Sequence, residues 1–186
     1  AEQDVQIPTP FGFMRDVFMT RRTFTDESWQ LGGRLFGGGF QQLSKEERKR
    51  ITITGEPVVE LDIKSCHATM AFAHVGIDWY AQSDQDLYSR LEDEGWPRDV
   101  VKKAFNIMMN AKSPKAAIGS LNYEQARSGF LMDSGMVPFQ RWSNDLVQSI
   151  QDAYPELEDV FYAELGNHFM NKEGNISNAI QEWLSL

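Results

Sequence analysis

The chain of 186 residues contains a single cysteine, Cys66. One thiol cannot form an internal disulfide or supply a thiolate zinc site, so we expect a reducing compartment such as the cytoplasm. No apolar stretch approaches the roughly 20 residues that a membrane-spanning helix needs, so we expect no membrane partner. The first residues are acidic and no apolar segment follows them, so we also expect no signal peptide.

Basic residues are outnumbered as well. The chain has 18 Lys and Arg against 27 Asp and Glu, a net charge of −9, which argues against a protein that coats nucleic acid non-specifically. Most of the excess acid lies in residues 133–186, whereas residues 34–50 and 98–115 carry local basic clusters. These clusters leave room for a groove that faces phosphates. Ordinary solvated helix faces are the alternative interpretation of either cluster.

Glycine and capping signals organise the first part of the chain. Five of the eight residues at 32–39 are glycine, which excludes a helix interior there. Ser44 and Glu47 form a capping-box pattern that predicts a short helix at 46–50. A turn around Gly55 then joins two strands, which we expect at 51–54 and 58–63.

Helical patterns dominate the rest, so the sequence predicts an α+β chain, rich in helices, with a small antiparallel hairpin sheet packed by them. Ser65 is expected to cap a helix at 68–75, and Pro97 is expected in the first turn of a helix at 96–111. Further helices are expected at 14–20, 26–31, 82–94, 114–121, 137–153 and 176–186.

Asp62 stands at the C-terminal end of the second expected strand. A carboxylate held there by a rigid element and facing a cleft suits a hard divalent cation such as Mg²⁺. A turn or helix-capping role is the alternative interpretation of one aspartate after a strand.

The glycine-rich segment 32–50 is a second candidate site. Its small residues let a backbone approach closely, and Arg34, Arg48 and Arg50 supply cations for phosphates. No Walker-type Gly-Lys-Ser/Thr follows, so the signal for phosphate binding is weak. In the next helix, core or hydrogen-bonded roles are the interpretation for His67 and His74, and Cys66 is interpreted as a small core hydrophobic residue.

A polar stripe recurs every four residues along the helix expected at 96–111. It consists of Arg98, Lys102, Asn106 and Asn110. Apolar residues fill most of the remaining circumference, so this helix should pack tightly while the stripe lines a groove. Cations about 6 Å apart along a helix match successive phosphates of a nucleotide or a nucleic acid. An ordinary amphipathic helix is the alternative.

The order of these segments along the chain matches the order of a known set of motifs. Segments 33–35, 41–43, 47–51 and 58–62 stand in the order of the motifs TGRLSS, LQNIP, EGRxIR and VxxDYSQIELRxMAxxxG. Met70, Ala71 and Gly76 keep the spacing of the last motif from its aspartate, and Arg98 with Lys102 resembles a following RxxxK. The chain thereby resembles the family A DNA polymerases over residues 32–111. The resemblance extends to the phage-type single-subunit RNA polymerases.

The resemblance implies a palm with a fingers-like helical part, and a template-dependent nucleotidyltransferase that uses two-metal phosphoryl transfer. By position, Asp62 would be the catalytic ligand of both Mg²⁺ ions, and Ile63 would lend a backbone carbonyl to one. The implied nucleotide-binding residues are Arg98, Lys102, Asn106, Asn110 and His67. The implied contacts to primer and template are Arg34, Gln42 and Arg48. DNA replication in a phage or mobile element is the implied setting.

Several positions depart from the family pattern. His67 replaces the glutamate that selects the sugar, and Asn106 and Asn110 stand where the family has aromatic residues. The family's second metal aspartate lies in a His-Asp pair, and the sequence contains no such pair. Because one carboxylate is insufficient for two Mg²⁺ ions, we expect either a C-terminally truncated chain or an inactive protein.

The sequence therefore predicts one polymerase-like domain made of four parts. These are a helical extension at 1–31, a palm-like part at 32–76, a fingers-like part at 77–130 and an acidic helical part at 131–186. Two other functions stay open: a non-catalytic descendant that binds nucleic acid or nucleotide, and a helical protein-interaction module. DNA or RNA as template, sugar selectivity, the primer requirement and oligomeric state stay open too.

Overall fold

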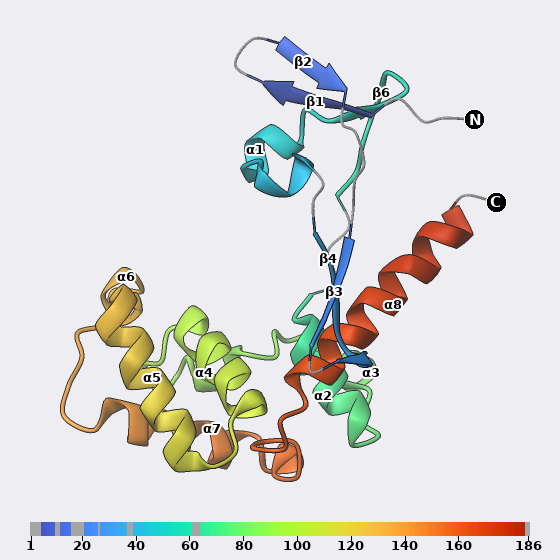
Figure 1. Ribbon diagram of the computed structural model, residues 1–186. Helices are drawn as coiled ribbons and strands as arrows, with labels where there is room; N and C mark the ends of the chain where they lie inside the picture. Colours follow the sequence, from blue (N-terminus) through green and yellow to red (C-terminus); the bar gives the residue numbers. More distant parts are fainter. Residues whose placement is uncertain are drawn as a thin grey trace. The chain divides into compact units, whose positions relative to one another are not determined.

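The computed structural model describes residues 5–9, 12–15, 21–25, 27–36, 39–60 and 64–184. Within them the chain is α+β and rich in helices, with small antiparallel sheets, as the sequence predicts. Figure 1 labels the elements along the chain. The strands are β1 (Val5–Thr9), β2 (Gly12–Arg15), β3 (Arg21–Thr25), β4 (Ser28–Phe36), β5 (Thr52–Ile53) and β6 (Glu56–Pro57).

The α-helices that the structure describes range from 4 residues in α1 to 19 residues in α8. The α-helices are α1 (Lys45–Arg48), α2 (Cys66–His74), α3 (Trp79–Gln82), α4 (Arg98–Asn110), α5 (Pro114–Ser128), α6 (Phe130–Asp133), α7 (Trp142–Ala153) and α8 (Gly166–Leu184). The 3₁₀ helices are η1 (Gly39–Gln42), η2 (Ser89–Leu91) and η3 (Pro155–Leu157).

Two compact units make up the chain, one formed by residues 1–63 and 174–186, the other by residues 64–173. In the first unit, antiparallel strands form a sheet in the order β2-β1-β5-β6. Ile7 of β1 and Ile51, which precedes β5, form a small buried cluster. Three partly buried residues pack around them, Phe40, Leu43 and Val58. The four-part division expected from the sequence stays a prediction.

The helices expected at 14–20 and 26–31 are wrong where the structure describes them. Residues 14–15 belong to β2, and β4 begins at Ser28 and pairs with β3 to form a separate antiparallel hairpin. The physical reason is pairing: β3 alternates exposed Arg21 and Thr23 with half-buried Arg22 and Phe24, a period of two. Residues 16–20 and 26 lie outside the described residues.

Two local predictions in the first unit are confirmed. Ser44 caps α1 with a full capping box, in which its hydroxyl accepts from the Glu47 backbone N–H and the Glu47 carboxylate accepts from the Ser44 N–H. The turn at Gly55 joins β5 and β6, although this second strand ends at Pro57, before the expected one begins. Residues 58–60 form no strand, and residues 61–63 lie outside the described residues.

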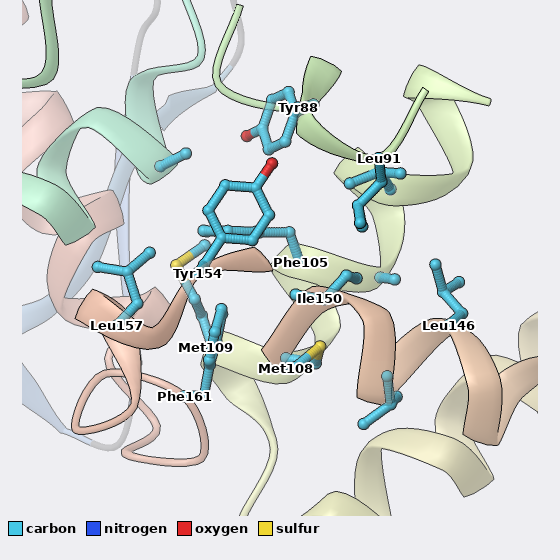
Figure 2. Close-up of a cluster of buried hydrophobic side chains, with 14 of the residues drawn as sticks. Tyr88, Leu91, Phe105, Met108, Met109, Leu146, Ile150, Tyr154, Leu157 and Phe161 are labelled. Atoms are coloured by element: carbon cyan, nitrogen blue, oxygen red, sulfur yellow. The ribbon is translucent and has the colours of Figure 1, made fainter. Parts of the chain in front are cut away.

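The core of the second unit is built around α4, as Figure 2 shows. Six residues on its inner face are buried: Val100, Val101, Ala104, Phe105, Met108 and Met109. The Phe105 ring meets the rings of Tyr88, Tyr154 and Phe161 at centroid distances of 5.6, 5.4 and 5.2 Å. Edge-on contacts of this kind stabilise by about 0.5–1.5 kcal/mol each beyond the burial of area. The helix expected at 96–111 is thereby confirmed over Arg98–Asn110, with Pro97 at the N-cap position and not in the first turn.

The helix expected at 82–94 is wrong. Residues 83–88 leave helical geometry because short polar side chains bind nearby backbone groups: Ser83 accepts from the Gln85 N–H, and Asp86 accepts from the Tyr88 N–H. Side chains that satisfy the backbone locally compete with a helix. Ser65, at the N-cap position of α2, adopts a left-handed conformation and its side chain makes no capping hydrogen bond.

The ends of three later helices differ from the sequence expectation. α5 extends to Ser128, where Gly129 terminates it in a left-handed conformation, φ 66°. α7 begins only at Trp142, after Pro138. α8 begins at Gly166, well before the expected 176. Gly166 has no side chain, and a Cβ there would overlap the side-chain amide of Asn110, which would have to shift for a larger residue to fit.

Candidate functional site

Asp62 and Ile63, the expected metal ligands, lie outside the described residues. The Mg²⁺ site at the end of the second strand therefore stays a prediction. Among the residues that the structure describes, no group of three or more His, Cys, Asp or Glu side chains is placed to hold a metal ion.

The polar stripe expected on one helix lies on α4, opposite its buried residues. Arg98 begins the helix, Lys102 is exposed one turn later, and Asn110 ends it. Four residues along an α-helix advance about 6 Å, so Arg98 and Lys102 present two cations at roughly the spacing of neighbouring phosphates. The four residues lie along α4 as the sequence predicts, whereas their binding to phosphates stays a prediction.

Arg98 is held in place by a carboxylate that the sequence pattern does not reveal, that of Asp86. Nε of Arg98 donates to Oδ1 of Asp86 at 3.1 Å, and Nη2 donates to Oδ2 at 2.8 Å. The guanidinium also lies 5.4 Å from the Tyr88 ring centroid. Burial raises the pKa of the Asp86 carboxyl, but the hydrogen bonds from Arg98 and the Tyr88 N–H outweigh it, so this pKa lies below its ordinary value. Arg98 is therefore a fixed cation, neutralised in part.

Lys102 differs from the other described cations around α4. Lys103 lies 3.3 Å from the Glu124 carboxylate, and Lys112 lies 3.6 Å from that of Glu164. Lys102 is exposed and makes no ion pair with a described residue. A lysine that makes no ion pair keeps more of its attraction for an external anion than a paired lysine does. Lys102 is thus the residue of α4 best placed to bind a phosphate.

The two asparagines of the stripe are used largely within the protein. Nδ2 of Asn110 donates to the Asn106 backbone carbonyl at 2.8 Å, and Asn110 also packs against Gly166. Oδ1 of Asn106 is buried and has no hydrogen-bond partner among the described residues. Their contribution to a nucleotide site therefore stays a prediction.

His67 lies on α2, half-buried. Its Nε2 is 3.2 Å from Oε2 of Glu173, with which it shares a hydrogen bond. This agrees with the hydrogen-bonded interpretation of His67. His74, at the end of the same helix, is exposed and its ring lies near that of Phe169, 6.1 Å between centroids, so a core position for His74 is wrong. Cys66 is partly buried.

The three residues expected to contact nucleic acid all belong to the first unit. Gln42 is exposed at the end of η1, and Arg34 occupies the β4 register position opposite Thr23. Arg48 makes two hydrogen bonds within the protein: its Nε donates to the Glu60 carboxylate at 2.9 Å, and its Nη1 donates to the Leu43 carbonyl at 2.8 Å. A contact between Arg48 and a phosphate would have to replace or share these bonds.

Sequence reasoning missed a groove between α4 and α5. A space of about 540 Å³ is lined by Lys103, Ile107, Ala116, Gly119, Ser120, Tyr123 and Glu124. A neighbouring space of about 360 Å³ continues it past Asn110 and Lys112. The sequence does contain a signal for this groove. Ala116, Gly119 and Ser120 are small, and the exposed Tyr123 follows them at helical spacing. The pattern was interpreted only as a helix.

Comparison with known proteins adds no relative to these observations. No protein-family model, no curated protein and no solved structure matches the chain. The helices that the structure describes include none with the length and apolar character needed to cross a bilayer.

Proposed function

We propose that this chain is the palm-and-fingers part of a template-dependent nucleotidyltransferase that works by two-metal phosphoryl transfer. In this proposal α4 is the fingers helix. It binds the triphosphate of an incoming nucleoside triphosphate through Lys102, with Arg98 as the second cation. The support from the sequence is the order and spacing of the polymerase-like motifs over residues 32–111.

The observation that carries the proposal is the state of Lys102. It is exposed, has no ion pair with a described residue, and lies one turn from Arg98 on a helix whose opposite face is buried. A packed helix fixes the backbone positions of Arg98 and Lys102 relative to each other, so less backbone entropy is lost when a ligand binds. Asp86 fixes the Arg98 fork, so the direction of this cation is set before a ligand arrives.

The chemistry requires metal ions, and Asp62 is the residue assigned to them. Mg²⁺ would activate the attacking hydroxyl and stabilise the leaving pyrophosphate. Within the proposal, Asp62 and the Ile63 carbonyl supply ligands from this chain. The family pattern takes its second carboxylate from a His-Asp pair, and this sequence contains no such pair. This sequence by itself is therefore expected to bind nucleotide without extending a primer.

The test is a titration of the full chain with a fluorescent deoxynucleoside triphosphate, with and without Mg²⁺. Lys102→Ala should weaken binding about 10- to 100-fold, the usual contribution of a hydrogen bond to a charged group. Lys115→Ala, which removes another exposed lysine from the neighbouring helix α5, is the matched control and should leave affinity within about twofold.

Asp62→Asn separates the enzyme-like function from simple nucleotide binding. If Asp62 holds Mg²⁺, this variant should lose the increase in affinity that Mg²⁺ gives and keep the affinity measured without it. Equal effects of Lys102→Ala and Lys115→Ala would contradict the site on α4. A full Mg²⁺ effect in Asp62→Asn would favour the non-catalytic descendant instead.

A further inference from the structure

Helices α4 and α5 contact each other within the second unit (Figure 1). α5 buries Ala117 and Leu121, whereas Gly119, Ser120 and Tyr123 of the same helix are exposed and line the groove of about 540 Å³ beside α4. Ligand sites in proteins are typically clefts of about 300–1,000 Å³ that combine apolar or aromatic walls with a few polar groups, and they often lie between helices. The groove is therefore large enough for a small organic ligand.

Gly119 lines the groove without a side chain. It lies inside α5, where glycine is less favourable than alanine because it loses more backbone entropy on folding. A Cβ at this position would meet no atom within 4 Å, so no contact within the described part of the chain requires glycine here. The missing side chain leaves room for an external ligand to lie against the backbone of the helix.

Tyr123 supplies an aromatic ring to the same groove. It is 65% exposed, and its ring contacts no other ring and no cation among the described residues. Tyr123 follows Gly119 by four residues, so both lie on one face of α5. Long side chains of a helix lean towards its N-terminus, which places this ring over the turn that contains Gly119. A flat ligand can thus pack on an aromatic surface and on the helix backbone at once.

The two charged residues that line the groove are paired with each other. Nζ of Lys103 lies 3.3 Å from Oε2 of Glu124, and it also lies 4.4 Å from the centroid of the Phe130 ring, which holds the ammonium in place. Ser120 adds an exposed hydroxyl. The lining therefore offers hydrogen-bond donors and acceptors without an unpaired charge. This favours an uncharged ring with donors and acceptors on its edge over a free anion or cation.

We infer that the groove between α4 and α5 binds a purine nucleoside, with its base packed on Tyr123 and over Gly119. A purine base is flat and carries several donors and acceptors on its edge, and stacking on an aromatic side chain is open to every base. The neighbouring space of about 360 Å³, which continues past Asn110, gives room for the sugar. The inference goes beyond the proposed function and does not depend on it, because this ligand needs no phosphate.

The test follows the amide NMR signals of Gly119 and Ser120 in the full chain during a titration with adenosine. Adenosine should shift both signals in the wild type. Tyr123→Ala should weaken binding about 5- to 100-fold, the usual contribution of stacking on one aromatic ring, whereas Tyr123→Phe keeps the ring and should retain most of the affinity.

Gly119→Ala places a methyl group where the base is expected to lie, so it should weaken adenosine binding about 10-fold. The same substitution should make the helix more stable, since alanine is favoured over glycine there. A loss of affinity in this variant therefore cannot come from unfolding. Asn122→Ala is the matched control, because Asn122 is exposed on the same helix and does not line the groove, and its affinity should stay within about twofold of the wild type.

Three outcomes would overturn the inference. The first is that adenosine shifts neither amide signal, or that Tyr123→Ala and Gly119→Ala bind it as Asn122→Ala does. The second is that indole, a bicyclic ring with one N–H, binds as tightly as adenosine, which would assign the groove to any flat apolar ring. The third is that the two signals shift with protein concentration and not with adenosine, which would assign the groove to a second copy of the chain.

Lys102→Ala separates this inference from the proposed function. Adenosine carries no phosphate, so this variant should bind adenosine as the wild type does while it loses affinity for the fluorescent nucleoside triphosphate. Loss of triphosphate binding in Lys102→Ala, in a chain that binds no adenosine, would refute the groove alone. Tyr123-dependent binding of adenosine, together with equal effects of Lys102→Ala and Lys115→Ala on the triphosphate, would refute the phosphate site on α4 and leave the groove assignment standing.

Discussion

Two tyrosines of the second unit should respond in opposite ways to the same change, the removal of the hydroxyl. The hydroxyl of Tyr154 is buried and donates to the Leu87 carbonyl, which is also buried. The hydroxyl of Tyr162 is buried without a hydrogen-bond partner among the described residues. Figure 2 shows Tyr154 inside the cluster around Phe105, with its hydroxyl pointing towards Tyr88. Phenylalanine keeps the ring and its packing in both cases.

The expected magnitudes follow from hydrogen bonding. Tyr154→Phe removes one bond and leaves the Leu87 carbonyl buried and unpaired, which should destabilise the protein by about 1–3 kcal/mol. Tyr162→Phe removes a desolvated hydroxyl that gains nothing in the folded state, so stability should stay constant or rise by about 1 kcal/mol. Burial raises the pKa of the Tyr154 phenol, and that of Tyr162 to about 12, so both hydroxyls stay protonated at neutral pH.

Urea denaturation followed by tryptophan fluorescence is the assay, because Trp79, Trp96 and Trp142 are buried in the same unit. With a slope of about 1–3 kcal/mol per molar urea, the two midpoints should differ by about 1 M. Tyr123→Phe, at a residue that is 65% exposed, is the control and should change stability by less than about 0.5 kcal/mol. If Tyr162→Phe lowers the midpoint as much as Tyr154→Phe, the reasoning from hydrogen bonding is wrong.

Three further predictions concern local interactions. The pKa of Asp86 is lowered in the folded state, so its ion pair stabilises the protein at pH values above the unfolded pKa of about 3.9, and this stabilisation is lost as the pH falls through the folded pKa. Arg98→Ala should therefore destabilise the protein at pH 7 and have little effect near pH 2 in urea titrations. Equal losses of stability at both pH values would contradict this. Gly119→Ala should stabilise by about 0.5–1 kcal/mol in the same assay, since this exposed helical position has open space for a methyl group, and a loss of stability would show hidden crowding. The Ser44 hydrogen bonds lower the pKa of Glu47, so Ser44→Ala should raise it towards its ordinary value in a carbon-detected NMR titration; no change would rule out the capping box in solution.

Signals contained in a few neighbouring residues were predicted correctly from the sequence. Ser44 and Glu47 satisfy each other's backbone across one turn, so their pattern is sufficient to locate α1. The apolar spacing around Phe105 located α4, and with it the spacing of Arg98 and Lys102. These features depend on contacts three or four residues apart, which the linear order already contains.

Features that depend on distant residues were missed or misassigned. Residues 26–31 were expected to be helical, but their backbone hydrogen bonds are made with β3, which a local pattern does not reveal. The partner of Arg98 was missed because Asp86 lies twelve residues away in a segment expected to be helical. The groove beside α5 was missed since it exists only where two helices pack.

The amino-acid sequence by itself determined the class of the fold, the long helix with its cations four residues apart, and the motif order on which the proposed chemistry rests. The tertiary structure decided which of those cations keep their charge available. Asp86 pairs with Arg98 and neutralises it in part, Glu124 pairs with Lys103, and Lys102 stays exposed. It also decided that Gly119 and Tyr123 line an open groove beside α4. The physical reason is that helical periodicity is a property of neighbouring residues, whereas the charge and exposure of a side chain depend on whatever the fold brings next to it.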